Sequence, residues 1–137
     1  MTDFDLTDLA NCLDAPQVEC VAPWNLERRG ITLSDWVKQE KNIFVGYGVP
    51  LSVLLGPDLP LVQRRKSKWE CRYRGYDYLM RYRQYVKRMW NELDELAGCT
   101  LGCYCRGNRH GCPCQILVKL YNRKQRLLPR VCSVKFI

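Results

Sequence analysis

The chain has 137 residues and a formal net charge of +8, and its length predicts one domain with a hydrophobic core of its own. It contains no apolar run long enough to cross a membrane, and its acidic N-terminus is unlike a signal peptide, so we expect neither a membrane-spanning nor a secreted protein. Nine cysteines without an export signal indicate a reducing cytosol or nucleus, where disulfides are not expected.

The charge is distributed unevenly along the chain. Residues before Arg28 include six acids and no basic residue, whereas residues 64–88 carry ten cations and two acids. This asymmetry predicts either a nucleic-acid surface or an acidic arm that docks on a basic face of its own domain or of a neighbour. We therefore expect an N-terminal arm over residues 1–40 and a domain over residues 41–137 that stays folded when residues before Trp24 are deleted.

The first half of the chain predicts short elements. Residues 2–13 are expected to form a helix, and residues 14–24 an extended connector because they contain two prolines. Thr32 or Ser34 can cap a short helix that ends near Glu40, with Asp35 at the acidic position of a capping box. Apolar runs then predict strands over residues 42–47, 51–55 and 61–63.

The second half predicts longer helices. A helical period favours one helix from Asp77 to Leu96, with Gly98 as its stop. A strand over residues 100–105, a glycine-containing loop and a helix that begins at Pro113 and ends before Pro129 should follow, and residues 131–137 are expected to add a closing strand. These elements predict a single small α/β domain with a mixed sheet and flanking helices.

The candidate metal ligands lie in the segment that joins the predicted strand 100–105 to the last helix. Cys103 and Cys105 share one face of the strand, and Cys112 and Cys114 lie at the start of the helix, so these four thiols could hold one structural zinc ion. His110, the chain's one histidine, could also close the site. Two alternatives are that the cysteines are small buried packing residues, or that Cys112 or Cys114 is a nucleophile activated at the helix N-terminus.

A second candidate site is the basic and aromatic segment from Arg64 to Trp90. Arginines neutralise phosphates and exposed aromatic rings stack on bases, which predicts an interface with nucleic acid or with another protein. The alternative is that half of the aromatic residues form the buried stripe of a helix. The expected interface residues are Arg72, Arg74, Arg81, Arg88, Trp69 and Tyr73.

Five short motifs occur in a recognisable order between Asn42 and Tyr121: Ile43–Gly46, Ser67–Trp69, Tyr82–Tyr85, Leu96–Gly98 and Leu101–Cys105. With these motifs the chain resembles an uncharacterised domain-of-unknown-function family of bacteria, phages and large DNA viruses. That family has the motifs Y-I-G-R, S-x-W-x-N-P-F, Y-R-x-Y, L-x-G-K-x-L-G-C-W-C and C-H-G-D-x-L. The resemblance implies a viral protein with the family's scaffold.

The departures from that family bear on activity. Pro113 and Gln115 stand where the last family motif has histidine and aspartate, its best acid–base candidates, and Cys71-Arg72-Tyr73 replaces N-P-F. We therefore expect a non-enzymatic interaction or structural protein in a larger assembly, such as a minor capsid or cement-like component of a virus particle. The alternatives are a nucleic-acid-binding accessory protein that uses residues 64–90 and, third, a nucleotide-directed enzyme. The expected location is the host cytoplasm or nucleus, or the virion.

Overall fold

The computed structural model describes residues 15–104 and 111–127 of the chain. Within them the chain forms a small α/β domain around three parallel strands. The strands are β1 (Gln17–Cys20), β2 (Asn42–Phe44) and β3 (Thr100–Cys103). The α-helices are α2 (Pro23–Arg28), α3 (Leu33–Lys38), α4 (Leu51–Leu55), α5 (Leu61–Lys66), α6 (Tyr78–Lys87) and α7 (Pro113–Leu127). The 3-10 helices are η1 (Gly56–Asp58), η2 (Ser67–Trp69) and η3 (Trp90–Leu96).

The sheet has the order β1-β3-β2, so the last strand in the sequence is the central one. Val18 and Ile43 both lie opposite Leu101, whereas Glu19 and Phe44 lie opposite Gly102. Because neighbouring residues of a strand point to opposite faces, the two sets cover different sides of the sheet. Both strand pairs of the described sheet are parallel. The prediction of a mixed sheet is therefore wrong for the described residues.

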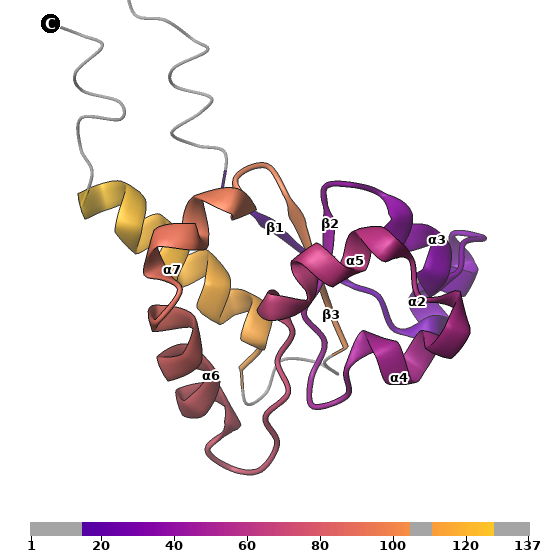
Figure 1. Ribbon diagram of the computed structural model, residues 1–137, viewed down its shortest axis with the longest axis horizontal. Helices are drawn as coiled ribbons and strands as arrows, with labels where there is room; N and C mark the ends of the chain where they lie inside the picture. The colour runs from indigo at the N-terminus through magenta and orange to yellow at the C-terminus, as the bar shows by residue number, and fades with distance from the viewer. Residues whose placement is uncertain (1–14, 105–110, 128–137) are drawn as a thin grey trace, which may run out of the picture.

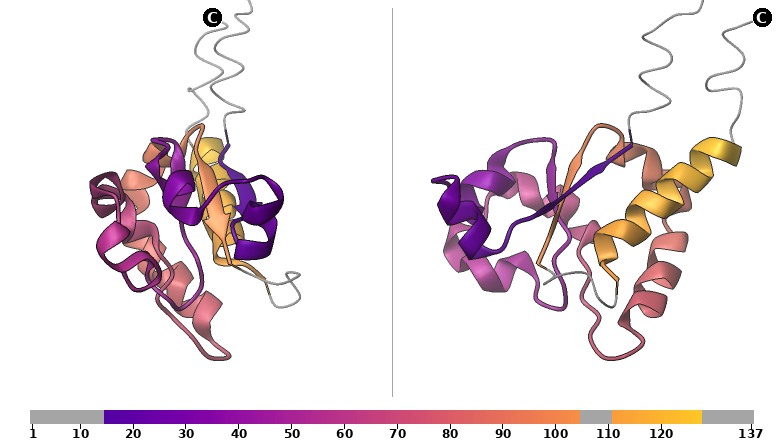
Figure 2. Two further views of the ribbon diagram at one scale, coloured as in Figure 1. Left: turned by 90° about the vertical axis from the view of Figure 1, so that its right-hand side faces the viewer. Right: turned by 180° about the vertical axis from the view of Figure 1, so that it is seen from behind.

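Except for α5, the α-helices gather in two groups. In Figure 1, α6 and α7 lie together with η3 on one side, α2, α3 and α4 lie on the other, and α5 lies between them; the right-hand view of Figure 2 shows the same division from behind. The larger core joins the Leu101 face of the sheet to α6, η3 and α7. The smaller core joins the Phe44 face to Leu26, Trp36 and Leu51.

Residues expected to form a connector are part of the sheet. The Gln17 N–H donates to the Cys99 carbonyl at 2.9 Å, and the Val21 N–H donates to the Cys103 carbonyl at 2.9 Å. Val21 and Ala22 are fully buried. Consequently β1, α2 and α3 all fall within residues 1–40, the range expected to form an arm. Residues 2–13 and 131–137, for which a helix and a strand are expected, lie outside the described residues.

Two predicted strands are helices instead. Residues 51–55 form α4 and residues 61–66 form α5, each directly after a proline in extended conformation, Pro50 or Pro60. The predicted helix over residues 77–96 is divided into α6 and η3. The strand predictions at β2 and β3 and the helix that begins at Pro113 are confirmed.

The predicted cap of α3 is also confirmed. The Asp35 N–H donates to Thr32 Oγ1 at 3.1 Å, and the Thr32 N–H donates to an Asp35 carboxylate oxygen at 3.5 Å, so the two residues complete a capping box. None of the helices in the described ranges combines the length and the hydropathy needed to cross a membrane.

Candidate functional site

Three of the predicted metal ligands meet at the end of β3. Cys103 is the last residue of β3, Cys112 precedes α7 and Cys114 lies in its first turn. Their Sγ atoms all lie within 4.8 Å of one another, and all three side chains are buried. The arrangement is compact enough for the three thiols to share one metal ion. Cys105 and His110, the other two predicted ligands, lie outside the described residues.

The local backbone explains why Cys112 returns to β3. Gly111 has a φ of +97°, a conformation that glycine adopts without strain. A Cβ on Gly111 would lie 2.5 Å from Cδ1 of Leu79, and the hydroxyl of Tyr78 donates to the Gly111 carbonyl at 3.2 Å. The first turns of α6 therefore fix the approach to α7, and Pro113 then begins that helix.

Burial controls the chemistry of these thiols. It raises the pKa of the Cys114 thiol well above its usual range, and hydrogen bonds with Cys103 and Cys112 raise it further. Burial also raises the pKa of the nearby Cys71 thiol to about 11. A raised pKa disfavours the thiolate, which is the form of cysteine that reacts as a nucleophile. The structure therefore gives no support to the alternative that Cys114 is an activated nucleophile.

The predicted arginine residues lie on the surface near the same core. Arg72, Arg74, Arg81 and Arg88 are all exposed, and we call these four residues the arginine face. Tyr73 is half-buried, and the Arg81 guanidinium lies 4.8 Å from the centre of its ring, within the range of a cation–π interaction. The structure thus brings Tyr73 to the arginine face.

Trp69 takes a different position from the one predicted. Its side chain is 1% exposed and belongs to the larger core, so it cannot meet a partner at the surface. Its carbonyl accepts a hydrogen bond from the buried Tyr82 hydroxyl, and the adjacent Lys68 carbonyl accepts one from Tyr85 at 2.7 Å. These bonds hold η2 against α6. The tyrosines of α6 therefore pack in or against the larger core. This is the alternative that the sequence left open for the aromatic residues of the segment.

Not all cations of the basic segment are available to a partner. The Lys66 ammonium is buried and donates to the carbonyls of Gln39 at 3.1 Å and Asn42 at 2.5 Å. The Lys68 ammonium lies between carboxylates of Glu92 and Glu95, at 2.6 Å and 2.9 Å. These two lysines join elements of the fold. Among the described side chains of the segment, the exposed cations are Lys87 and five arginines: Arg65, Arg72, Arg74, Arg81 and Arg88.

A pocket of about 370 Å³ lies beside the arginine face. It is lined by Arg65, Ser67, Lys68, Glu70, Arg72, Tyr73 and Tyr85. Glu70 is buried and accepts from the Gln63 amide at 3.0 Å, and Arg72 lies 3.6 Å from its carboxylate. Cations beside two tyrosine rings can receive an anionic, ring-containing ligand. Glu70 is not among the residues predicted for the interface, and its signal in the sequence is that it is one of two acids among the ten cations of residues 64–88.

No family model, curated protein or solved structure matches this chain. The resemblance to the domain-of-unknown-function family accordingly stays a prediction.

Proposed function

We propose that the protein is a non-enzymatic interaction protein that works as a component of a larger assembly, such as a virus particle, and that the arginine face is its binding surface. The observation that carries the proposal is the exposure of four arginines along one segment whose backbone is fixed by the core. Arginine, tyrosine and methionine are enriched where proteins meet. Tyr76, which is fully exposed, and Met80, which is 58% exposed, lie in the same segment.

The rigid support of this face favours binding. Tyr82 and Tyr85 on α6 donate hydrogen bonds to the carbonyls of Trp69 and Lys68, so the backbone on both sides of Arg72 and Arg74 is held before any partner arrives. A surface that is already ordered loses less conformational entropy on association. Pro113 and Gln115, which replace the acid–base pair of the resembled family, support a binding role over a catalytic one.

A second candidate function is the binding of nucleic acid by the same face. The pocket beside Arg72 favours it, because the exposed Arg65 and Arg72 line this pocket together with Tyr73 and Tyr85. Phosphates would be neutralised by the cations while a base contacts a tyrosine ring. A single structural zinc ion, if bound, would serve the fold in either function and would take no part in recognition.

The proposal is tested by reversing charge on the arginine face. The variant Arg81→Glu with Arg88→Glu changes two exposed cations of α6 and its C-terminal cap. The control variant Lys119→Glu with Arg123→Glu makes the same change in charge on two exposed positions of α7. Each tagged full-length protein is expressed where the native assembly forms, and its share in the large complexes is measured by sedimentation.

We expect the arginine-face variant to lose most of its share in the large complexes, by at least tenfold, while the control keeps it. Equal incorporation of both variants and the unmodified protein would contradict the proposal. Binding of fluorescent single- and double-stranded DNA to the unmodified protein tests the second candidate. Affinity that falls steeply with salt, and falls further in the arginine-face variant alone, would favour nucleic acid as the partner.

A further inference from the structure

The cluster of Cys103, Cys112 and Cys114 has features that packing alone does not require. Cys103 ends a strand, and Cys112 and Cys114 lie nine and eleven residues further along at the start of a helix, yet their Sγ atoms gather within 4.8 Å of one another. Each is buried, at 5%, 1% and 0% exposure. The backbone that brings them together depends on a glycine with positive φ, Gly111, packed under Leu79.

We propose that Cys103, Cys112 and Cys114 form a structural metal centre that binds one thiophilic ion, and that zinc is the ion it takes. The proposal concerns the interior of the domain and stands apart from the function of the arginine face. Zinc bound by cysteine has a metal–sulfur distance of about 2.3 Å, which places tetrahedral ligand sulfurs about 3.8 Å apart. Sulfur atoms already within 4.8 Å of one another need to move by roughly 1 Å or less to reach this geometry.

The chemistry of the ligands selects the metal. All three donors are sulfur, which binds zinc and other soft ions well, whereas magnesium and calcium require oxygen ligands. The burial of all three side chains favours a structural role for the ion. A structural zinc takes four ligands, so one further donor would complete the tetrahedron around the ion. A bound ion would cross-link β3 to α7.

The cysteine cluster also lies next to side chains of α6. Tyr82 of α6 is buried beside Cys112 and Cys114 in the larger core, and Tyr78 and Leu79 contact Gly111 directly. Metal binding should therefore stabilise the contact between α7 and α6 as well as the link to β3. The expected consequence is a cooperative gain in the stability of the whole domain.

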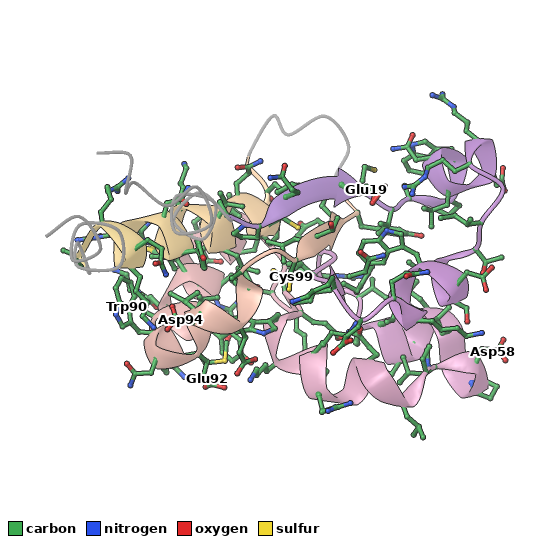
Figure 3. The ribbon with its side chains drawn as sticks, turned by 90° about the horizontal axis from the view of Figure 1, so that it is seen from above. Glu19, Asp58, Trp90, Glu92, Asp94 and Cys99 are labelled. Atoms are coloured by element: carbon green, nitrogen blue, oxygen red, sulfur yellow. The ribbon has the colours of Figure 1, made fainter. Side chains whose placement is uncertain are left out.

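The competing explanation is that these cysteines are small hydrophobic residues of the core. Cys99 offers a matched control, because it is 4% exposed, belongs to the same core and lies outside the thiol cluster. Figure 3 places Cys99 near the middle of the molecule. If packing were the whole role of the cluster, neither Cys114→Ala nor Cys99→Ala should affect the metal content.

The test uses the full-length chain purified under reducing conditions and reconstituted with zinc. Zinc content is measured by mass spectrometry of the metal, and the melting temperature is measured before and after a chelator. We expect about one zinc per chain and a melting temperature that the chelator lowers by several degrees. Cys114→Ala and Cys112→Ala should each lower the zinc content several-fold, whereas Cys99→Ala should retain it.

Cobalt substitution in the unmodified chain keeps the test decisive if the cluster variants fail to fold. Cobalt bound to thiolates gives a sulfur-to-metal charge-transfer absorption. We expect this absorption to saturate at about one equivalent of cobalt per chain and to disappear when added zinc displaces the cobalt. A reduced, folded chain that takes up neither ion would overturn the proposal. So would an equal loss of metal in Cys99→Ala and Cys114→Ala, or full metal content in Cys114→Ala.

Discussion

Gly102 shows how one residue in the central strand determines the packing on one face of the sheet. A Cβ at this position would lie 2.6 Å from Cη2 of Trp36 and 3.0 Å from Cγ1 of Val21. The Trp36 indole can approach the strand this closely only because this Cβ is absent, and its N–H donates to Glu19 at 2.9 Å. The smaller core is therefore built around a position where a side chain does not fit.

Gly102→Ala should lower the free energy of unfolding by about 1–3 kcal/mol, because the new methyl group collides with the buried ring. Urea denaturation measures the change. In the background of Trp36→Phe, which removes the nearest ring atoms, the same substitution should cost clearly less, so the two changes should be non-additive. Strict additivity would contradict the contact.

Individual residues also show what sequence alone could not assign. The ten cations of residues 64–88 look alike in the sequence, yet Lys66 is buried against the carbonyl groups that follow α3, whereas Arg72 is exposed. Lys66 meets these carbonyl groups because α5 packs against α3 in the folded domain. The local sequence around Lys66 does not encode this packing. The thiol cluster was easier to predict, because Cys103 ends a recognisable strand and Cys112 and Cys114 flank a proline that can start a helix.

At the scale of elements, the predictions succeeded where the pattern was long or the boundaries were clear. The helix α7 keeps a helical period over four turns and begins at a proline, and it was predicted correctly. Residues 51–55 and 61–63 were wrongly predicted as strands, because an apolar run of this length fits a buried strand or a helical turn equally well. The division of α6 from η3 was missed because apolar residues continue at helical spacing through the break.

The link between η2 and η3 rests on Lys68, whose ammonium lies between Glu92 and Glu95. Figure 3 shows Glu92 on η3, with Trp90 and Asp94 nearer to α7, where the Lys124 ammonium donates to the Trp90 carbonyl at 3.0 Å and to Asp94 at 3.1 Å. Two lysines thus tie η3 to its neighbours on different sides. Partial burial lowers the pKa of Lys68, but the hydrogen bonds to Glu92 and Glu95 outweigh that effect and raise it overall.

Lys68→Met should lower the free energy of unfolding at neutral pH by about 0.5–1 kcal/mol. The loss is modest because the ion pairs of Lys68 with Glu92 and Glu95 are partly exposed. A lysine with a raised pKa contributes stability that is fully present below its ordinary pKa of 10.5 and is lost as the pH rises through the folded-state value. The difference between variant and unmodified protein should therefore shrink above pH 10.5. Lys119→Met, on the exposed side of α7, is the control and should change stability little at any pH.

For the whole molecule, the order of the strands is the feature that sequence analysis could not supply. The strand β1 is short and lies in an acidic segment with two prolines, so it lacks a strong strand pattern of its own. It becomes a strand by pairing with β3, about 80 residues later in the chain. Parallel pairing between such distant segments depends on the intervening helices and leaves no local signature. Glu19 of β1 then pairs with Arg29 within the same domain.

This topology makes opposite predictions for two N-terminal truncations. Removal of residues 1–14 leaves β1 in place and should preserve a cooperative unfolding transition. Removal of residues 1–23 deletes β1 together with the buried Val21 and Ala22, exposes one edge of the central strand β3 and uncovers part of both cores. We expect the longer truncation to lose cooperative unfolding or to aggregate, because an uncovered central strand also offers unpaired backbone groups to other chains.

Circular dichroism during thermal denaturation, together with sedimentation of the purified truncations, distinguishes these outcomes. A cooperative transition in the protein that lacks residues 1–23, close to that of the full chain, would show that these residues are separable from the domain, as the charge pattern suggested. If that protein is unfolded while the shorter truncation is folded, its failure to join an assembly would reflect lost stability. The shorter truncation then becomes the proper test of whether the acidic N-terminal residues take part in binding, because its domain is intact.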